Sequence, residues 1–141
     1  MRNAIEDRFG SDALRAQVRS GSELSEVLAR TSACLDRLEF DTAARRRTLM
    51  AMEELTINAL MHAEPPDGVF LITSVARERV RLRLVYRGPE FDPSDVSLPG
   101  PARPEALGGQ GLRLAQAAAD TLLYRRRGVI NEVDVSVSPR A

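Results

Sequence analysis

The strongest candidate for chemistry is the segment EELTINALMHA, which runs from Glu53 to Ala63. Glu54 and Asn58 stand four residues apart, so on a helix their side chains share one face. A carboxylate and an amide oxygen placed together can serve a hydrated magnesium ion, and a carboxylate near a phosphate can orient or deprotonate a hydroxyl group. The segment alone favours a plainer interpretation, in which Asn58 hydrogen-bonds nearby backbone and Glu54 is solvated.

A second candidate is the glycine cluster GGQGL at residues 108–112. Glycines that lead into a helix expose backbone N–H groups at the positive end of the helix dipole, and this combination can bind phosphate. The pattern is weak by itself, because clustered glycines also simply form turns.

A third segment, LVYRGPEFDP at residues 84–93, lies between the other two. It predicts a strand that ends in a Gly88-Pro89 turn, followed by an apolar Phe91 that packs into the core. An irregular stretch rich in proline and glycine continues from Arg87 to Gly111. Loops of this length inside a domain are usually functional or disordered.

Hydrophobic spacing predicts the elements that must position these groups. Apolar residues mostly three, four or seven apart predict a helix from Glu23 to Leu38, and Asp41 is placed to cap a second helix from Thr42 to His62. The sequence EPPDG at residues 64–68 then ends that helix. The rest of the chain predicts two strands at Val69–Val75 and Arg79–Tyr86, followed by a helix at Leu112–Ala119. A closing hairpin follows, with strands at Thr121–Arg126 and Val129–Val137.

The order of these elements indicates a two-layer α+β sandwich, with the helices on one face of a mixed, mostly antiparallel sheet. We expect residues 1–141 to form one domain, with the first forty the least clear. Ala4–Phe9 is either a short edge strand or frayed chain, and Ser11 or Ser20 caps a helix.

The strand at residues 79–86 has the strict alternation of a sheet with one wet face and one covered face. One face carries arginines and the other aliphatic residues: Arg79, Arg81 and Arg83 against Val80, Leu82 and Leu84. The pattern favours a solvated arginine row. The alternative is a docking surface for an acidic partner.

The bulk composition excludes several classes of protein. The 141 residues are 43% hydrophobic and carry a formal net charge of zero, which argues against disorder and against nucleic-acid binding. All twenty basic residues are arginine, and the one cysteine, Cys34, excludes an internal disulfide. No apolar run is long enough to span a membrane and the N-terminus has no signal core, so we expect a cytoplasmic protein without a membrane partner.

Taken in chain order, the three segments resemble the Bergerat-fold ATPase superfamily of gyrases, heat-shock chaperones and histidine kinases. Within it, they are most similar to the stand-alone anti-sigma-factor serine kinases. Members show E-x-x-x-N-A-x-x-H-A on a helix, then D-x-G-x-G-F-D-P in a loop, then G-G-x-G-L opening a helix. The first motif is matched by Glu54, Asn58, Ala59, His62 and Ala63, and the third by Gly108, Gly109, Gly111 and Leu112. The resemblance covers about residues 40–138.

The resemblance implies a role for each matching residue. Asn58 would bind the magnesium ion that bridges the ATP phosphates, and Glu54 would be the catalytic base for a serine hydroxyl on an anti-anti-sigma partner. Residues 93–107 would form a lid, and His62 would pack or cap. The nucleotide-binding glycines would be Gly88, Gly108, Gly109 and Gly111, the last three around the phosphates.

The middle motif departs from the family at two positions. Tyr86 stands where the family has the aspartate that accepts a hydrogen bond from the adenine amino group, and Glu90 stands where it has a second glycine. Removing a charged acceptor from a buried hydrogen bond costs about 1.5–3 kcal/mol, which is ten- to a hundredfold in affinity. Glu90 adds a Cβ and a negative charge near an anionic ligand.

Three interpretations therefore stay open. In the first, the chain is an anti-sigma-factor-like regulator. It phosphorylates an anti-anti-sigma partner with Mg-ATP, sequesters a sigma factor, or does both. The alternative is a protein-binding module with a degenerate nucleotide site and no cofactor, which regulates a bacterial transcription or stress switch by contact alone. Members of this group often pair as homodimers. An unrelated α+β binding protein is a third alternative.

Overall fold

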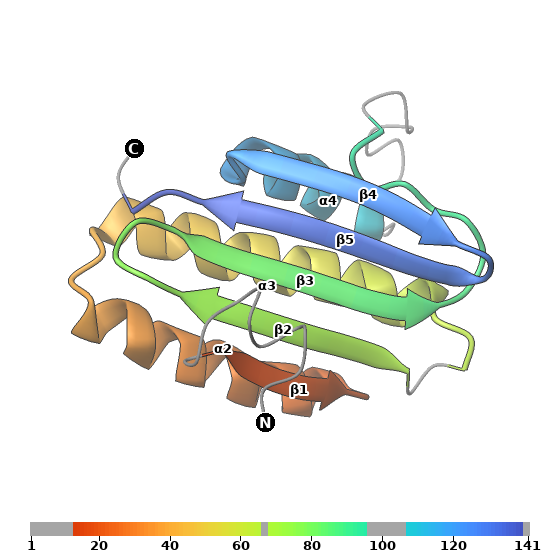
Figure 1. Cartoon of the computed structure of the whole chain (residues 1–141), viewed down its shortest axis with the longest axis horizontal. Coiled ribbons are helices and arrows are strands. Elements are labelled where there is room, and N and C mark those ends of the chain that lie inside the picture. The colour runs from red at the N-terminus through yellow and green to blue at the C-terminus, as the bar shows by residue number, and fades with distance from the viewer. Residues whose placement is uncertain (1–12, 66–67, 96–106, 140–141) are drawn as a thin grey trace.

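Five strands and three helices make two layers in the computed structural model, which describes residues 13–65, 68–95 and 107–139, with residues 107–110 described by their backbone alone. Figure 1 shows the helices on one face of the sheet, while the other face is turned toward the viewer. The expected two-layer α+β sandwich is therefore confirmed. The strands are β1 (Leu14–Val18), β2 (Val69–Val75), β3 (Val80–Arg87), β4 (Thr121–Arg127) and β5 (Ile130–Val137), and the helices are α2 (Gly21–Arg37), α3 (Thr42–His62) and α4 (Leu107–Ala118).

The sheet has the strand order β1-β2-β3-β5-β4, and each neighbouring pair is antiparallel. The expected sheet was mixed and mostly antiparallel, whereas the described sheet is entirely antiparallel. The physical reason is the connection through α4, which carries the chain from β3 to the outer edge before β5 returns to the middle. β4 and β3 run in the same direction, but β5 lies between them, so the sheet contains no parallel pair within the described strands.

The edge strand β1 lies at Leu14–Val18, where the sequence interpretation expected no strand, so a helix capped by Ser11 is wrong and Ser20 is the cap. It pairs with β2 over five residues, from Leu14 opposite Thr73 to Val18 opposite Val69. Val18 is fully buried, while Arg15 is exposed on the other side of the strand. The segment Ala4–Phe9, expected as an edge strand or frayed chain, lies outside the described residues.

The first two helices begin at side-chain caps. The Oγ of Ser20 accepts a hydrogen bond from the backbone N of Glu23 at 3.3 Å, which places the start of α2 two residues before the expected one. The Oδ1 of Asp41 accepts from the backbone N of Ala44 at 2.7 Å, so α3 begins and ends where the sequence predicted. No helix in the described ranges is long and apolar enough to cross a membrane.

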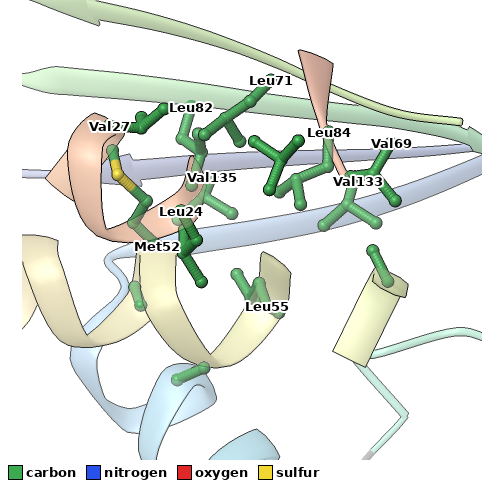
Figure 2. Packing of buried hydrophobic residues seen from close by; sticks show 14 of the residues in the cluster. Leu24, Val27, Met52, Leu55, Val69, Leu71, Leu82, Leu84, Val133 and Val135 are labelled. Carbon is green, nitrogen blue, oxygen red and sulfur yellow. The ribbon is translucent and has the colours of Figure 1, made fainter. Parts of the chain in front are cut away.

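The core lies between the sheet and the helices, as Figure 2 shows. The alternate residues of β3 and β5 point into it, as the period of two predicted, and α3 supplies the opposing surface. The labelled core residues are Leu24, Val27, Met52, Leu55, Val69, Leu71, Leu82, Leu84, Val133 and Val135. A smaller apolar cluster of Leu35, Phe40, Ala44 and Val80 closes the end where α2 meets α3.

Helix α4 begins at Leu107, five residues before the predicted start at Leu112. The glycine cluster at 108–111 therefore lies inside the first turns of the helix and not in a loop ahead of it. The hairpin of β4 and β5 follows as expected, and Gly128, at φ 58°, forms its turn.

Candidate functional site

Helix α3 carries the two residues that the sequence singled out for chemistry. Asn58 is 5% exposed, and within the part of the chain that the structure describes its side-chain amide has no hydrogen-bond partner. Glu54, one turn earlier, is half-buried. The Asn58 amide is therefore available to a ligand.

The structure brings Glu54 against the glycine cluster. A Cβ built on Gly111 would lie 1.8 Å from the Oε2 of Glu54 and 2.6 Å from its Cδ. The carboxylate thus occupies the space that any larger residue at position 111 would need. The sequence expected these groups to face each other, and the packing of α4 on α3 places Glu54 and Gly111 in direct contact. Gly108 and Gly109 lie in the first turn of α4, where the backbone N–H groups have no partner within the helix.

The environment of Glu54 raises the pKa of its carboxyl group. Partial burial is the larger cause, and the neighbouring carboxylate of Glu53 is the second. A raised pKa makes a carboxylate a stronger base for the proton of a hydroxyl group. Among the described residues, no group of three His, Cys, Asp or Glu side chains is placed to hold a metal ion.

Gly88 allows the end of β3 to lie against the end of α3. A Cβ at this position would lie 2.5 Å from the backbone carbonyl oxygen of His62, so only glycine fits. A backbone hydrogen bond holds this approach, since Glu64 N donates to Arg87 O at 2.7 Å. On the other side, Gly88 N donates to Val129 O at 3.0 Å and ties the end of β3 to the turn between β4 and β5. This packing explains why position 88 is glycine without any role in nucleotide binding.

Asn131 is the hub of a polar network behind the Gly88-Pro89 turn, and it is fully buried. Its Nδ2 donates to the carbonyl oxygens of Pro89 at 3.0 Å and Gly88 at 3.4 Å. Its Oδ1 accepts from the hydroxyl of Tyr124 at 2.5 Å and from Nη1 of Arg126 at 2.9 Å. Arg126 also donates to the Gly88 carbonyl at 2.9 Å. The turn is therefore held by side chains of β4 and β5.

The sequence interpretation did not assign a role to Asn131, Tyr124 or Arg126, although one signal was present. Asn131 occupies the core phase of β5, in which the other members are Val133, Val135 and Val137. A lone amide in an otherwise apolar phase indicates a buried hydrogen-bonding role. Its partners come from elsewhere in the chain, and only the fold could show them.

Tyr86 points into the core and is 2% exposed. It continues the apolar phase of β3, and its strand partners are Val69 and Asn131. Burial, together with the nearby Tyr124 hydroxyl, raises the pKa of Tyr86 to about 12, against the opposing effect of Arg126. The hydroxyl is therefore neutral at physiological pH. Glu90, the other altered position, is exposed.

The segment after the Gly88-Pro89 turn contacts helices α3 and α4. The rings of Phe91 and His62 stack with centroids 4.2 Å apart and planes 20° apart, and partial burial lowers the pKa of His62. Phe91 is half-buried against the core, and the contact fits the packing role expected for His62. Gln116 of α4 donates from Nε2 to the carbonyl of Pro93 at 2.7 Å. The expected lid, residues 93–107, lies mostly outside the described residues.

Comparisons with known proteins agree with this fold. A family profile described as the histidine kinase-like ATPase domain matches residues 19–137. The structure of the RsbU and RsbW domains of Rv1364c from Mycobacterium tuberculosis superposes with a TM-score of 0.64 and 16% identity, over 91% of this chain and 33% of that one. This chain thus spans about a third of that structure.

Two histidine kinases superpose less closely. The Acinetobacter baumannii histidine kinase AdeS gives a TM-score of 0.51 at 15% identity, over 97% of this chain and 72% of that one. The histidine kinase domain of the Erythrobacter litoralis EL346 blue-light activated histidine kinase gives 0.51 at 18% identity, over 94% and 67%. No curated protein sequence gives a significant match. These identities speak for the fold alone, but the family profile spans most of the sequence, and the chain belongs to the histidine kinase-like ATPase domain family.

Proposed function

We propose that this domain is an anti-sigma-type regulator that acts on a partner protein by contact and has lost specific recognition of adenine. The observation that carries the proposal is the buried phenol of Tyr86, which stands where the resemblance places an aspartate. A neutral hydroxyl with a pKa of about 12 offers no carboxylate to the adenine amino group. Losing a charged acceptor in a buried hydrogen bond weakens binding about ten- to a hundredfold.

The network behind the Gly88-Pro89 turn supports the same proposal. The Gly88 carbonyl already accepts from Arg126 and the Pro89 carbonyl from Asn131, at 2.9 Å and 3.0 Å. The turn is therefore ordered by the protein itself and needs no nucleotide to hold its shape. Glu90 adds a negative charge to the same loop, and this charge repels the phosphates of ATP.

A serine kinase acting on an anti-anti-sigma partner is the second candidate, because the other half of the site fits Mg-ATP. The unpartnered amide of Asn58 is suited to a magnesium ion, which would neutralise phosphate charge when bound. Glu54, with its raised pKa, is suited to take the proton of a serine hydroxyl. The glycines at the start of α4 place backbone N–H groups at the positive end of that helix, which suits a phosphate.

The partner of the proposed regulator is an antagonist domain, a sigma factor or both, in the cytoplasm. The similar structure from Mycobacterium tuberculosis contains an RsbU domain together with an RsbW domain, which supports a regulatory protein as the partner. A homodimer is also part of the proposal, since members of the resembled group often pair.

Titration with Mg-ATP, followed by thermal shift and calorimetry, tests the proposal. A site with a dissociation constant of about 10 μM would stabilise the fold by about 2.7 kcal/mol at about 1 mM nucleotide, which raises Tm by several degrees. We expect a shift of less than about 2 °C, because recognition of adenine is lost. A shift of several degrees, together with transfer of labelled phosphate to a purified anti-anti-sigma domain, would overturn the contact-only function and support the kinase.

A paired variant provides the control. Tyr86→Asp combined with Glu90→Gly restores the family residues and is expected to bind Mg-ATP at least tenfold more tightly. Glu90→Gly alone separates the charge effect from the adenine effect. A double variant that stays folded and binds no better would show that Tyr86 does not limit binding.

A further inference from the structure

The open face of the sheet carries a strong excess of positive charge. Strand register places its outward residues in cross-strand rows, such as Arg15, Ile72, Arg83, Asp134 and Leu123. Over the five strands these rows hold six arginines, Arg15, Arg81, Arg83, Arg87, Arg125 and Arg127, but only two carboxylates, Glu132 and Asp134. The described strands therefore contribute four more basic than acidic side chains to this face, although the formal net charge of the chain is zero.

The two carboxylates are already engaged by arginines of the same face, and the Nε of Arg125 lies 3.8 Å from Oε2 of Glu132. The Nε of Arg83 lies 2.6 Å from Oδ1 of Asp134, and its Nη1 lies 3.5 Å from Oε1 of Glu132. Arg83 is only 7% exposed, so the expectation that the whole arginine row is solvated is wrong at this residue. Its neighbours carry the unbalanced charge: in the part of the chain that the structure describes, neither Arg79 nor Arg81 has a carboxylate partner.

These arginines surround a hollow with an apolar side chain in it. The hollow has a volume of about 280 Å³, and Arg79, Arg81, Arg125 and Leu123 are among its lining residues. Leu123 is 65% exposed, which is high for a leucine on a strand. Arginine is enriched at protein interfaces, and an exposed apolar side chain gains stability when a partner removes it from water. Figure 1 looks onto this face, and the described helices all lie behind it.

We propose that this open face, at β3, β5 and β4, binds an acidic polypeptide segment of a partner protein. Its carboxylates pair with Arg79 and Arg81, and an apolar side chain packs on Leu123. Charge complementarity selects this occupant. A second copy of the chain would oppose two faces with the same excess of positive charge.

Fluorescence anisotropy with a labelled twelve-residue peptide of alternating Glu and Leu tests the proposal at low salt. We expect saturable binding that is lost at about 0.5 M salt, because exposed ion pairs are screened. Arg79→Gln with Arg81→Gln should weaken binding about three- to tenfold, since partly exposed pairs contribute modestly. Leu123→Ser tests the apolar contact, and it too should weaken binding. The matched control is Arg30→Gln with Arg46→Gln, which removes the same charge from exposed sites on the helices and should leave binding unchanged.

Several results would overturn this assignment. These are an absence of saturable peptide binding, an equal loss in the control double variant, no effect of the Leu123 variant, or tighter binding of a labelled oligonucleotide. Sedimentation that reveals a dimer abolished by Arg79→Gln with Arg81→Gln would assign the face to a second copy instead. The Mg-ATP titration is expected to be identical in the variants, so this proposal can fail while the proposed function stands.

Discussion

Replacing Gly88 by alanine tests whether this glycine serves the fold or only a ligand. The new Cβ would lie 2.5 Å from the carbonyl oxygen of His62, whereas an ordinary close carbon-to-oxygen contact is about 3.3 Å. The obstacle is backbone, so no side chain can rotate to relieve it. The end of β3 must therefore move away from α3 by about 0.8 Å.

The magnitude follows from what that movement disturbs. Overpacking of this kind costs about 1–3 kcal/mol, and the backbone hydrogen bond from Glu64 to Arg87 contributes about 1 kcal/mol. That bond, at 2.7 Å, spans the gap between α3 and β3 that would widen, whereas the bond from Gly88 to Val129, at 3.0 Å, joins β3 to the turn between β4 and β5. We expect Gly88→Ala to lower the free energy of unfolding by about 2–4 kcal/mol and Tm by roughly 6–12 °C.

Urea unfolding followed by circular dichroism, without nucleotide, measures this loss. Gly21→Ala is the matched control, because no atom lies within 4 Å of a Cβ built there, and its effect should stay within about 0.5 kcal/mol. If Gly88→Ala matches that control, the close approach to His62 does not constrain the fold. The glycine would then be required only for a ligand.

Three further predictions concern the network and the Glu54 contact. Asn131→Ala should lower the free energy of unfolding by about 2–4 kcal/mol, because it leaves buried polar groups without a hydrogen-bond partner, whereas Tyr124→Phe should lower it by about 1 kcal/mol. Equal losses in urea unfolding would contradict the central role of Asn131. Because the folded-state pKa of Glu54 is raised, the folded chain holds its proton to higher pH, so stability falls as pH rises above the ordinary value of 4.5. Glu54→Gln should remove that fall, and an unchanged pH profile of Tm would argue against it. Gly111→Ala should displace the Glu54 carboxylate at little cost, since only the flexible end of that side chain must move. In the background of Glu54→Ala, Gly111→Ala should raise the free energy of unfolding by about 1 kcal/mol, because alanine has the higher helix propensity. If the effects of the two substitutions on the free energy of unfolding are strictly additive, Glu54 and residue 111 are not in contact.

Local chemistry explains why most elements could be predicted. Asp41 caps α3 with its own side chain, and the alternation of Val133, Val135 and Val137 orients β5 without reference to any distant residue. The strand β1 was missed because five residues with a mixed pattern need the partner strand β2 to define them. The start of α4 was misplaced because glycine has low helix propensity, which the contact with α3 overrides.

The sequence by itself determined the helix caps, the strand phases, the three motifs and the two departures at Tyr86 and Glu90, because these depend on neighbours within a few residues. Tertiary structure alone decided that Gly88 abuts the His62 carbonyl, that Asn131 holds the turn, and that Arg83 is neutralised on an otherwise basic face. Each of these contacts joins residues far apart in the chain. Their distances are set by how the sheet and helices pack, which no local pattern encodes.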